Sequence, residues 1–319
     1  MNKIIILLLV LLVNFSCKKE TKSNIDVSNI NINVEVDRFE QKFFNTTAET
    51  LPKLKSEYPY LFPIYNSDSI WMRKINNKDE IELFNKTQEV FDDFTEQKSE
   101  ITDLFKHIKY YHKNFTAPKI ITLVTDLDYE SKVIYADSLL FVSLDLYLGK
   151  DNSAYLDFPA YISQNFDKSQ LVVDIANEIG KKYFNNGAKR QFLDIIIDEG
   201  KRIYLTESYL PNHSKASLLG YTPEALEWAT INESQIWKYF IENKLLYSPD
   251  PNLRMRFIDK APFSKFFIDI DKESPGSIGV WLGWQIVTSY MNNNNVTLQQ
   301  LLQTNADEIF KKSKYKPKK

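Results

Sequence analysis

Four residues in the second half of the chain stand at the spacing of a zinc-peptidase site. In such enzymes two histidines four residues apart bind the metal from one helix face, and a glutamate after the first is the general base. Here Asn177 and Lys181 occupy the histidine positions, and Glu178 occupies the position of the base. Glu199, on the next predicted helix, follows at a distance suited to a third ligand. The spacing of a zinc-peptidase site is therefore present, but other residue types occupy the two histidine positions.

These side chains do not suit zinc. Zinc binds imidazole, thiolate or carboxylate groups, whereas the Asn177 amide is a poor ligand and the Lys181 ammonium would repel the ion. We therefore expect no metal, no cofactor and no catalytic residue here. Two interpretations remain: Glu178 and Lys182 form an ion pair on the helix surface, or Lys181 and Glu199 pair inside a closed cleft.

Other catalytic patterns are missing from the sequence. It has no serine elbow, no Walker loop and no glycine-rich nucleotide turn. The acidic pairs Asp126 with Asp128 and Asp269 with Asp271 sit near strand or loop ends, where such residues usually stabilise turns rather than act as glycosidase acids. The three histidines lie far from residue 177 in the sequence.

The N-terminus predicts export and lipid attachment. Residues 4–13 are an unbroken aliphatic run, too short to cross a bilayer, which needs about 20 residues. Ser16 then precedes Cys17, the only cysteine in the chain. This is the layout of a bacterial lipoprotein signal, in which residues 1–16 are removed and the Cys17 thiol receives the lipid. An ordinary secretory signal with a chance cysteine is the alternative.

The composition is that of a globular protein behind a flexible tether. Of 319 residues, 43% are apolar and 26% are charged, and the net charge of −2 argues against nucleic acid as a partner. A single cysteine allows no internal disulfide. Residues 17–33 are polar and predict the tether, and residues 34–319 predict one globular domain.

The pattern of apolar residues predicts an α+β fold that is mainly helical. Runs at 120–125, 132–136 and 139–144 are rich in β-forming residues and indicate a small antiparallel sheet, to which residues 34–39 could add a short strand. Thr222 is expected to cap one of the helices. The expected helices cover residues 46–58, 78–111, 170–184, 188–205, 223–245, 278–291 and 298–310.

The helix expected at 278–291 is apolar on all sides, which predicts that it is buried in the body of the domain. Gly279 and Gly283 are four residues apart, so one side of this helix is open to close approach by another backbone. Trp281 and Trp284 fill a different side.

Several stretches together resemble one family, the gliding-motility lipoproteins of the GldB type from the Bacteroidota. The resemblance runs from about residue 36 to residue 317, behind the lipoprotein signal. The matching stretches are Asp37-Arg38-Phe39, Tyr58-Pro59-Tyr60-Leu61-Phe62, Leu127-Asp128-Tyr129-Glu130, Leu146-Tyr147-Leu148-Gly149, Pro275-Gly276, Gly279-Val280-Trp281-Leu282-Gly283-Trp284-Gln285-Ile286-Val287 and Ser313-Lys314-Tyr315-Lys316-Pro317.

The resemblance implies a cell-envelope lipoprotein that is needed for gliding and linked to the type IX secretion and motility machinery. It implies no enzyme activity, and only Cys17 carries over as a modified residue. It also implies a distant similarity to zincin-type peptidases, with Asn177, Glu178, Lys181 and Glu199 as a degenerate site.

We therefore expect a non-enzymatic protein, held on a membrane by its N-terminal lipid and facing the periplasm, with protein partners in the gliding apparatus. An envelope zinc peptidase and a lipoprotein that binds peptide or glycan are the alternatives.

Overall fold

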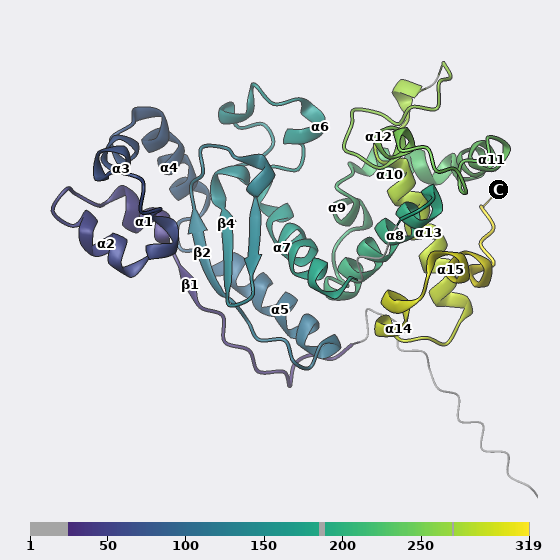
Figure 1. The fold of residues 1–319 in the computed structure, drawn as a ribbon, viewed down its shortest axis with the longest axis horizontal. Coiled ribbons are helices and arrows are strands. Elements are labelled where there is room, and N and C mark those ends of the chain that lie inside the picture. Colours follow the sequence, from purple (N-terminus) through teal and green to yellow (C-terminus); the bar gives the residue numbers. More distant parts are fainter. Residues whose placement is uncertain (1–24, 185–188, 270, 319) are drawn as a thin grey trace, which may run out of the picture.

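The computed structural model describes residues 25–184, 189–269 and 271–318. The helices before residue 91 lie at one end, a small sheet lies next to them, and the helices after residue 190 form the other end (Figure 1). The expected signal at 1–16, Cys17 and the first part of the tether lie outside the described residues. Within the described part, no helix combines the length and the apolar character that crossing a membrane requires.

The described residues form one four-stranded mixed sheet, in the order β1-β2-β4-β3. The strands are β1 (Val36–Asp37), β2 (Lys119–Leu123), β3 (Val133–Ala136) and β4 (Leu139–Ser143). The α+β class and the positions of the strands are confirmed, but the prediction of an antiparallel sheet is wrong. Strand β2 runs parallel to both β1 and β4, and only β3 and β4 are antiparallel.

Burial on both faces explains the parallel pairing. Ile120 of β2 packs into the larger hydrophobic core, while its neighbour Ile121 packs into a second core on the opposite face. Strands covered on both sides are typical of parallel pairs. A tight turn at Asp137 and Ser138 then returns β4 between β2 and β3, so β2 and β3 are consecutive in the sequence but not adjacent in the sheet.

One face of the sheet is covered by the N-terminal lobe, which comprises residues 39–90. Its helices are α1 (Phe39–Phe44), α2 (Leu51–Glu57), α3 (Asp68–Ile75) and α4 (Lys78–Val90). Phe39, Phe43, Tyr58 and Phe62 pack against one another and, with Ile121, form part of the second core. The helix expected at 46–58 begins only at residue 51 and ends before Pro59, as proline requires.

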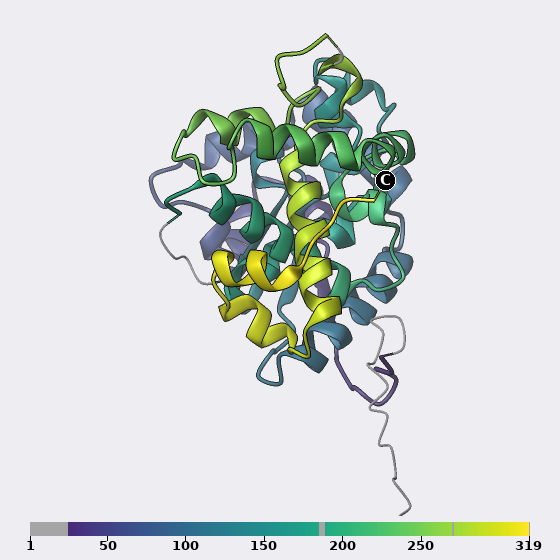
Figure 2. The same ribbon diagram turned by 90° about the vertical axis from the view of Figure 1, so that its right-hand side faces the viewer.

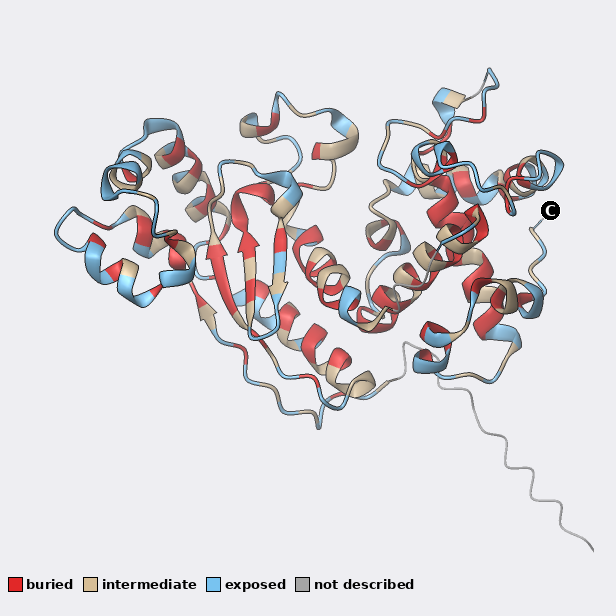
Figure 3. Cartoon of the chain, viewed as in Figure 1, coloured by how far each residue is buried: buried red, intermediate tan, exposed pale blue. Residues whose placement is uncertain are grey.

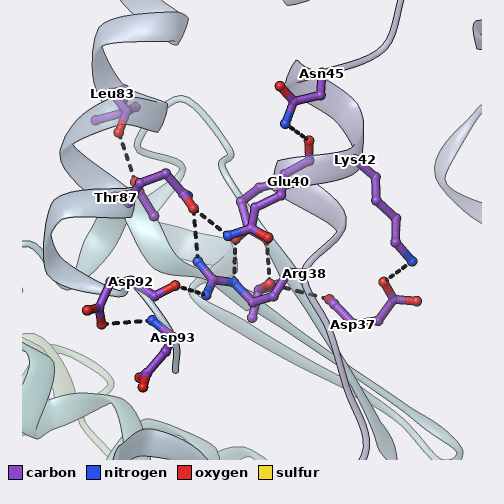
Figure 4. A network of polar contacts seen from close by, with 12 residues as sticks. Asp37, Arg38, Glu40, Lys42, Asn45, Leu83, Thr87, Asp92 and Asp93 are labelled. Carbon is purple, nitrogen blue, oxygen red and sulfur yellow. Dashed lines mark hydrogen bonds and ion pairs between the residues drawn. The ribbon is translucent and has the colours of Figure 1, made fainter. Parts of the chain in front are cut away.

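Charged groups buried beneath this lobe join α1 to the sheet (Figure 4). The Glu40 side chain has no exposed surface, and it accepts hydrogen bonds from Arg38 Nε at 2.6 Å and from Thr122 Oγ1 at 2.5 Å. Asp37 is nearly buried and accepts from Lys42 Nζ at 2.6 Å and Lys119 Nζ at 2.8 Å. Burial alone would raise the pKa of Asp37, but these hydrogen bonds hold it below its usual value.

The other face of the sheet packs on the larger core, which the remaining helices build (Figure 3). The stretch at 78–111, where one or two helices are expected, forms two, α4 and α5, whereas the single helices expected at 223–245 and 298–310 are each divided in two. These helices are α5 (Thr95–Tyr111), α6 (Ala160–Ser163), α7 (Leu171–Gly180), α8 (Phe192–Tyr209), α9 (Lys215–Leu219), α10 (Pro223–Ile231), α11 (Glu233–Glu242), α12 (Asn252–Phe257), α13 (Ile278–Asn293), α14 (Leu298–Gln303) and α15 (Ala306–Ser313). Thr222 caps α10, as expected.

Helices α8 and α13 cross with their backbones in contact, and α13 runs down the centre of this half (Figure 2). A Cβ atom added to Gly283 would lie 1.9 Å from the carbonyl oxygen of Ile196, and one added to Gly200 would lie 2.3 Å from the backbone of Gly283. The expected close approach at Gly283 is thus confirmed. Trp281 and Trp284 are buried, also as expected.

We predict that Gly283→Ala lowers the free energy of unfolding by at least about 2 kcal/mol, because the new methyl group collides with backbone that cannot move independently. Gly180→Ala is the matched control. Its Cβ would meet only the end of the Leu205 side chain, at 3.3 Å, and the gain in helix propensity of ~0.5–1 kcal/mol offsets that contact. Chemical denaturation of both variants checks this, and equal losses would contradict the crossing as described.

We also predict that Arg38→Met costs about 3 kcal/mol, because it leaves the buried Glu40 carboxylate without its cation. Lys53→Met should cost less than about 0.5 kcal/mol, since Lys53 is 80% exposed and lies 3.9 Å from Glu57. Adding Glu40→Gln to Arg38→Met should recover part of the loss. Urea denaturation of the four proteins tests this, and a loss that Glu40→Gln does not reduce would rule out the buried charge as its cause.

Candidate functional site

A cleft of about 500 Å³ opens between α7 on the sheet side and the helices α8, α9 and α10. Its sheet-side wall includes Tyr129 and Glu130, and its other wall is completed by two loops at 260–262 and 275–277. Asn177, Glu178 and Lys181 line it, which places three of the four sequence-predicted positions in one cavity. The fourth, Glu199, lies on α8 behind the lining residue Arg202.

A guanidinium group lies between the two expected ligand positions. Arg202 donates from Nε to Glu199 Oε2 at 2.8 Å and from Nη1 to Asn177 Oδ1 at 2.9 Å. Thr206, one helical turn further along α8, donates to the same Asn177 oxygen at 2.9 Å. The amide and the carboxylate are therefore brought together, as the frame suggests, but by an arginine that the sequence reasoning did not single out.

The environment keeps Glu199 charged. Burial alone would raise the pKa of this carboxyl, but the adjacent Arg202 guanidinium holds it below its usual value, with smaller contributions from Arg254 and Lys189. The charge of Glu199 is therefore neutralised by Arg202 and is not available to a ligand in the cleft.

Both sequence-based interpretations of the ion pairs are wrong. Lys181 pairs with Glu178, its neighbour at i−3, at 2.5 Å, and not with Glu199. Lys182 pairs with Asp137 of the β3–β4 turn at 2.6 Å, and not with Glu178. The reason is reach: Arg202 is already within one helical turn of Glu199 and satisfies it, which leaves Lys181 to the nearer carboxylate at the mouth of the cleft.

A second charged cluster lies deeper on the sheet side of the cleft. Lys132, only 12% exposed, donates to Asp174 Oδ2 at 2.5 Å, and the Tyr147 hydroxyl donates to the same oxygen at 2.9 Å. Burial, together with the charge of Asp174, raises the pKa of Tyr147 well above its usual value, so the phenol stays a donor. The Lys132 ammonium also lies over the Tyr147 ring, 4.6 Å from its centre.

A buried carboxylate fixes the loop that forms the sheet-side wall. Asp145 has no exposed surface and accepts the backbone N–H groups of Thr125 at 3.0 Å and Leu127 at 2.8 Å. It thereby holds Asp126 and Leu127 at positive φ, of 58° and 61°. Burial raises the pKa of Asp145 to about 6. The loop then delivers Tyr129 to the cleft, so Asp126 acts in a turn, as expected.

Two of the stretches that carry the family resemblance line this cleft: the stretch at 127–130 contributes Tyr129 and Glu130, and the stretch at 275–276 contributes the rim residue Gly276. A third, at 146–149, lies behind the lining, where Tyr147 bonds to Asp174. A Cβ on Gly276 would lie 2.1 Å from the carbonyl oxygen of Ala261, so only glycine allows the two rim loops to meet here.

The histidines lie outside the cleft. The ring of His112 stacks on Tyr183 with centroids 3.5 Å apart, and its Nε2 lies 2.6 Å from the Tyr209 hydroxyl. Burial lowers the pKa of His112 to about 4, so the ring is neutral at pH 7. Among the residues that the structure describes, no group of three or more His, Cys, Asp and Glu side chains could hold a metal ion.

Fold and cleft together define a mainly helical α+β protein in which an arginine bonds to both Asn177 and Glu199. The family model described as gliding motility protein GldB matches residues 20–317, so the chain belongs to this family. The resemblance seen in the sequence is thereby confirmed, and membership implies a role in gliding motility. Comparison with curated proteins gives no match, and neither does comparison with solved structures.

The sequence reasoning missed the residues that give the cleft its charge. Glu199 and Arg202 stand at i and i+3 on a helix, a spacing that could have suggested their pairing. Lys132 and Asp174 come from a strand entry and from α7, and Lys260 comes from a rim loop. No local pattern links residues so far apart in the chain, so only the fold brings them together.

We predict that Arg202→Met lowers the free energy of unfolding at pH 7 by about 2–3 kcal/mol, because it leaves Glu199 buried and unpaired. The pKa of Glu199 then rises above its unfolded value, since burial is no longer opposed. A raised folded-state pKa gives stability that is present at low pH and lost as pH rises, so the deficit should shrink between pH 7 and pH 4.

Arg202→Met combined with Glu199→Gln is the control for this prediction, because it removes the buried charge as well. The double variant should be more stable than Arg202→Met at pH 7, with a weaker dependence on pH. Urea denaturation across this pH range measures both effects. A deficit of Arg202→Met that stays constant with pH would mean that Glu199 does not depend on the guanidinium.

Proposed function

We propose that this protein is a non-enzymatic, lipid-anchored component of the cell envelope, which serves gliding motility and the type IX secretion machinery by docking protein partners. It would be attached to a membrane through lipid on Cys17 and face the periplasm. Its body would descend from a zincin-type peptidase whose site has lost the metal ligands.

The observation that carries the non-enzymatic part is the position of Arg202. A peptidase of this frame needs a cation-binding pocket between residues 177 and 199, with a free general base beside it. Here a guanidinium with fixed charge bonds to both Asn177 and Glu199. Glu178, at the position of the base, is engaged by Lys181. Each change opposes metal-assisted hydrolysis.

Sequence and family together support the anchoring part. The run at residues 4–13 followed by Ser16 and Cys17 has the layout of a lipoprotein signal. The family match begins at residue 20, directly behind this signal. Several acyl chains hold a protein durably, whereas one alone binds only marginally.

We predict that Cys17→Ala releases the protein from membranes and abolishes gliding in cells that carry no other copy of it. Cell fractionation measures attachment, and tracking of single cells measures motility. Cys17→Ala cells that glide normally with soluble protein would refute the need for an anchor.

Glu178→Gln tests the non-enzymatic part in the same cells. A general base is essential to a metallopeptidase, so a hydrolase would lose its function with this variant. We expect Glu178→Gln cells to glide at the wild-type rate, and metal analysis of the purified protein to find no stoichiometric zinc. Loss of gliding together with near-stoichiometric zinc would establish the peptidase alternative instead.

A further inference from the structure

We propose that the cleft binds an acidic peptide segment of a partner protein, whose carboxylate is received by Lys260 beside Arg202 and Lys132. This inference rests on the proposed function, because it specifies how the protein docks a partner. It adds the site, the residue that recognises the ligand and the chemistry of the ligand.

Among the described residues, the ion pairs of the cleft leave one lysine and one carboxylate, Glu130, without a counter-ion. Among the residues that line the cleft, Lys132 pairs with Asp174, Lys181 pairs with Glu178, and Arg202 pairs with Glu199 from behind. Lys260 has no hydrogen bond or ion pair with any residue in the part of the chain that the structure describes. Of the lining cations, Lys260 is thus the one free to take an external carboxylate.

The surroundings of Lys260 favour an anion. Its ammonium lies in the electrostatic field of Lys132 and Arg202, both positive, and of the single carboxylate of Asp174. Lys260 is exposed to solvent where it lines the cleft, and its ammonium experiences repulsion from the like charges of Lys132 and Arg202. A carboxylate placed between Lys260 and its two cationic neighbours would relieve that repulsion and form charge-assisted hydrogen bonds.

The size and lining of the cleft favour a peptide over a small anion. A volume of about 500 Å³ is larger than one carboxylate or phosphate fills, and lies in the range of ligand-binding pockets. Apolar side chains and backbone surround the charged base, including Leu218, Tyr221, Pro262 and Pro275. Such a rim suits a segment in which apolar residues flank an acidic one. Glu130 on the sheet-side wall adds an acceptor for a backbone N–H.

The rim is rigid enough to recognise a ligand. The Tyr221 hydroxyl donates to the carbonyl oxygen of Gly276 at 2.8 Å. The side-chain amide of Asn165 donates to the carbonyl oxygen of Gly220 at 3.1 Å. The first bond ties the loop after α9 to the loop before α13. The second ties it to the end of α6 on the sheet side. The walls are therefore held before a ligand arrives, which reduces the entropy cost of binding.

The mature full-length protein in detergent micelles serves for the test by isothermal titration calorimetry. The probe is a capped tetrapeptide of alternating leucine and glutamate, and its counterpart with glutamine in place of glutamate is the comparison. We expect the glutamate peptide to bind at least about tenfold more tightly than the glutamine peptide. We expect Lys260→Met to lower the affinity for the glutamate peptide by about tenfold, which corresponds to ~1.4 kcal/mol of binding free energy.

Lys312→Met is the matched control, because Lys312 is 58% exposed on α15, pairs with Glu308 and does not line the cleft. Its peptide affinity should equal that of the wild type. Lys260→Met should also unfold at about the same denaturant concentration as the wild type, since the exposed Lys260 side chain has no hydrogen bond or ion pair with the described residues to lose. A residue with a purely structural role would instead lower the stability when replaced.

Three outcomes would overturn the proposal. The first is equal binding of both peptides, and the second is an unchanged affinity in Lys260→Met. The third is inorganic phosphate that binds with the same dependence on Lys260 and displaces the peptide, which would make this a site for small anions. Failure of the proposed function looks different: Cys17→Ala cells would glide normally while the purified protein still bound the glutamate peptide.

Discussion

The backbone contact between α8 and α13 is the constraint on which the rest of the helical half depends. Gly200 and Gly283 let the two helices touch without intervening side chains. That contact fixes the position of α8 relative to α13, and therefore the position of Arg202, two residues after Gly200. Since Arg202 joins α8 to Asn177 of α7, the position of the sheet-side wall relative to the helices follows from the same crossing.

Among the described residues, the cleft combines paired charges with two unpaired ones, Lys260 and Glu130. Glu199 is satisfied by Arg202 of its own helix, and Asp174 by Lys132, which precedes β3. Such pairs are costly to bury and are weak evidence for stability alone. They do, however, set the orientation of the groups that remain. In this cleft the remaining groups are Lys260 and Glu130, which line it from opposite walls without a counter-ion among the described residues.

Much of the fold could be predicted from the sequence, because periodicity reports burial directly. The apolar helix at 278–291 and the strands at 120–125 and 139–144 correspond to α13, β2 and β4. The direction of the strands could not be predicted, since the insertion of β4 beside β2 depends on burial of both sheet faces. In the site, Asn177 and Glu199 were placed in one region correctly. Their shared partner, Arg202, was missed because the spacing of a metal site suggests only the positions of the ligands, and not an arginine between them.

The short strand β1 has a mechanical consequence. The chain enters the domain from its N-terminal side through Val36 and Asp37, which pair with β2 in parallel. Tension on that end would therefore load the β1–β2 hydrogen bonds in shear, with all of them sharing the force. Directly behind them stand the buried ion pairs of Asp37 with Lys119 and of Arg38 with Glu40. A pull on the N-terminal end would therefore meet resistance at this charged cluster, which lies away from the cleft.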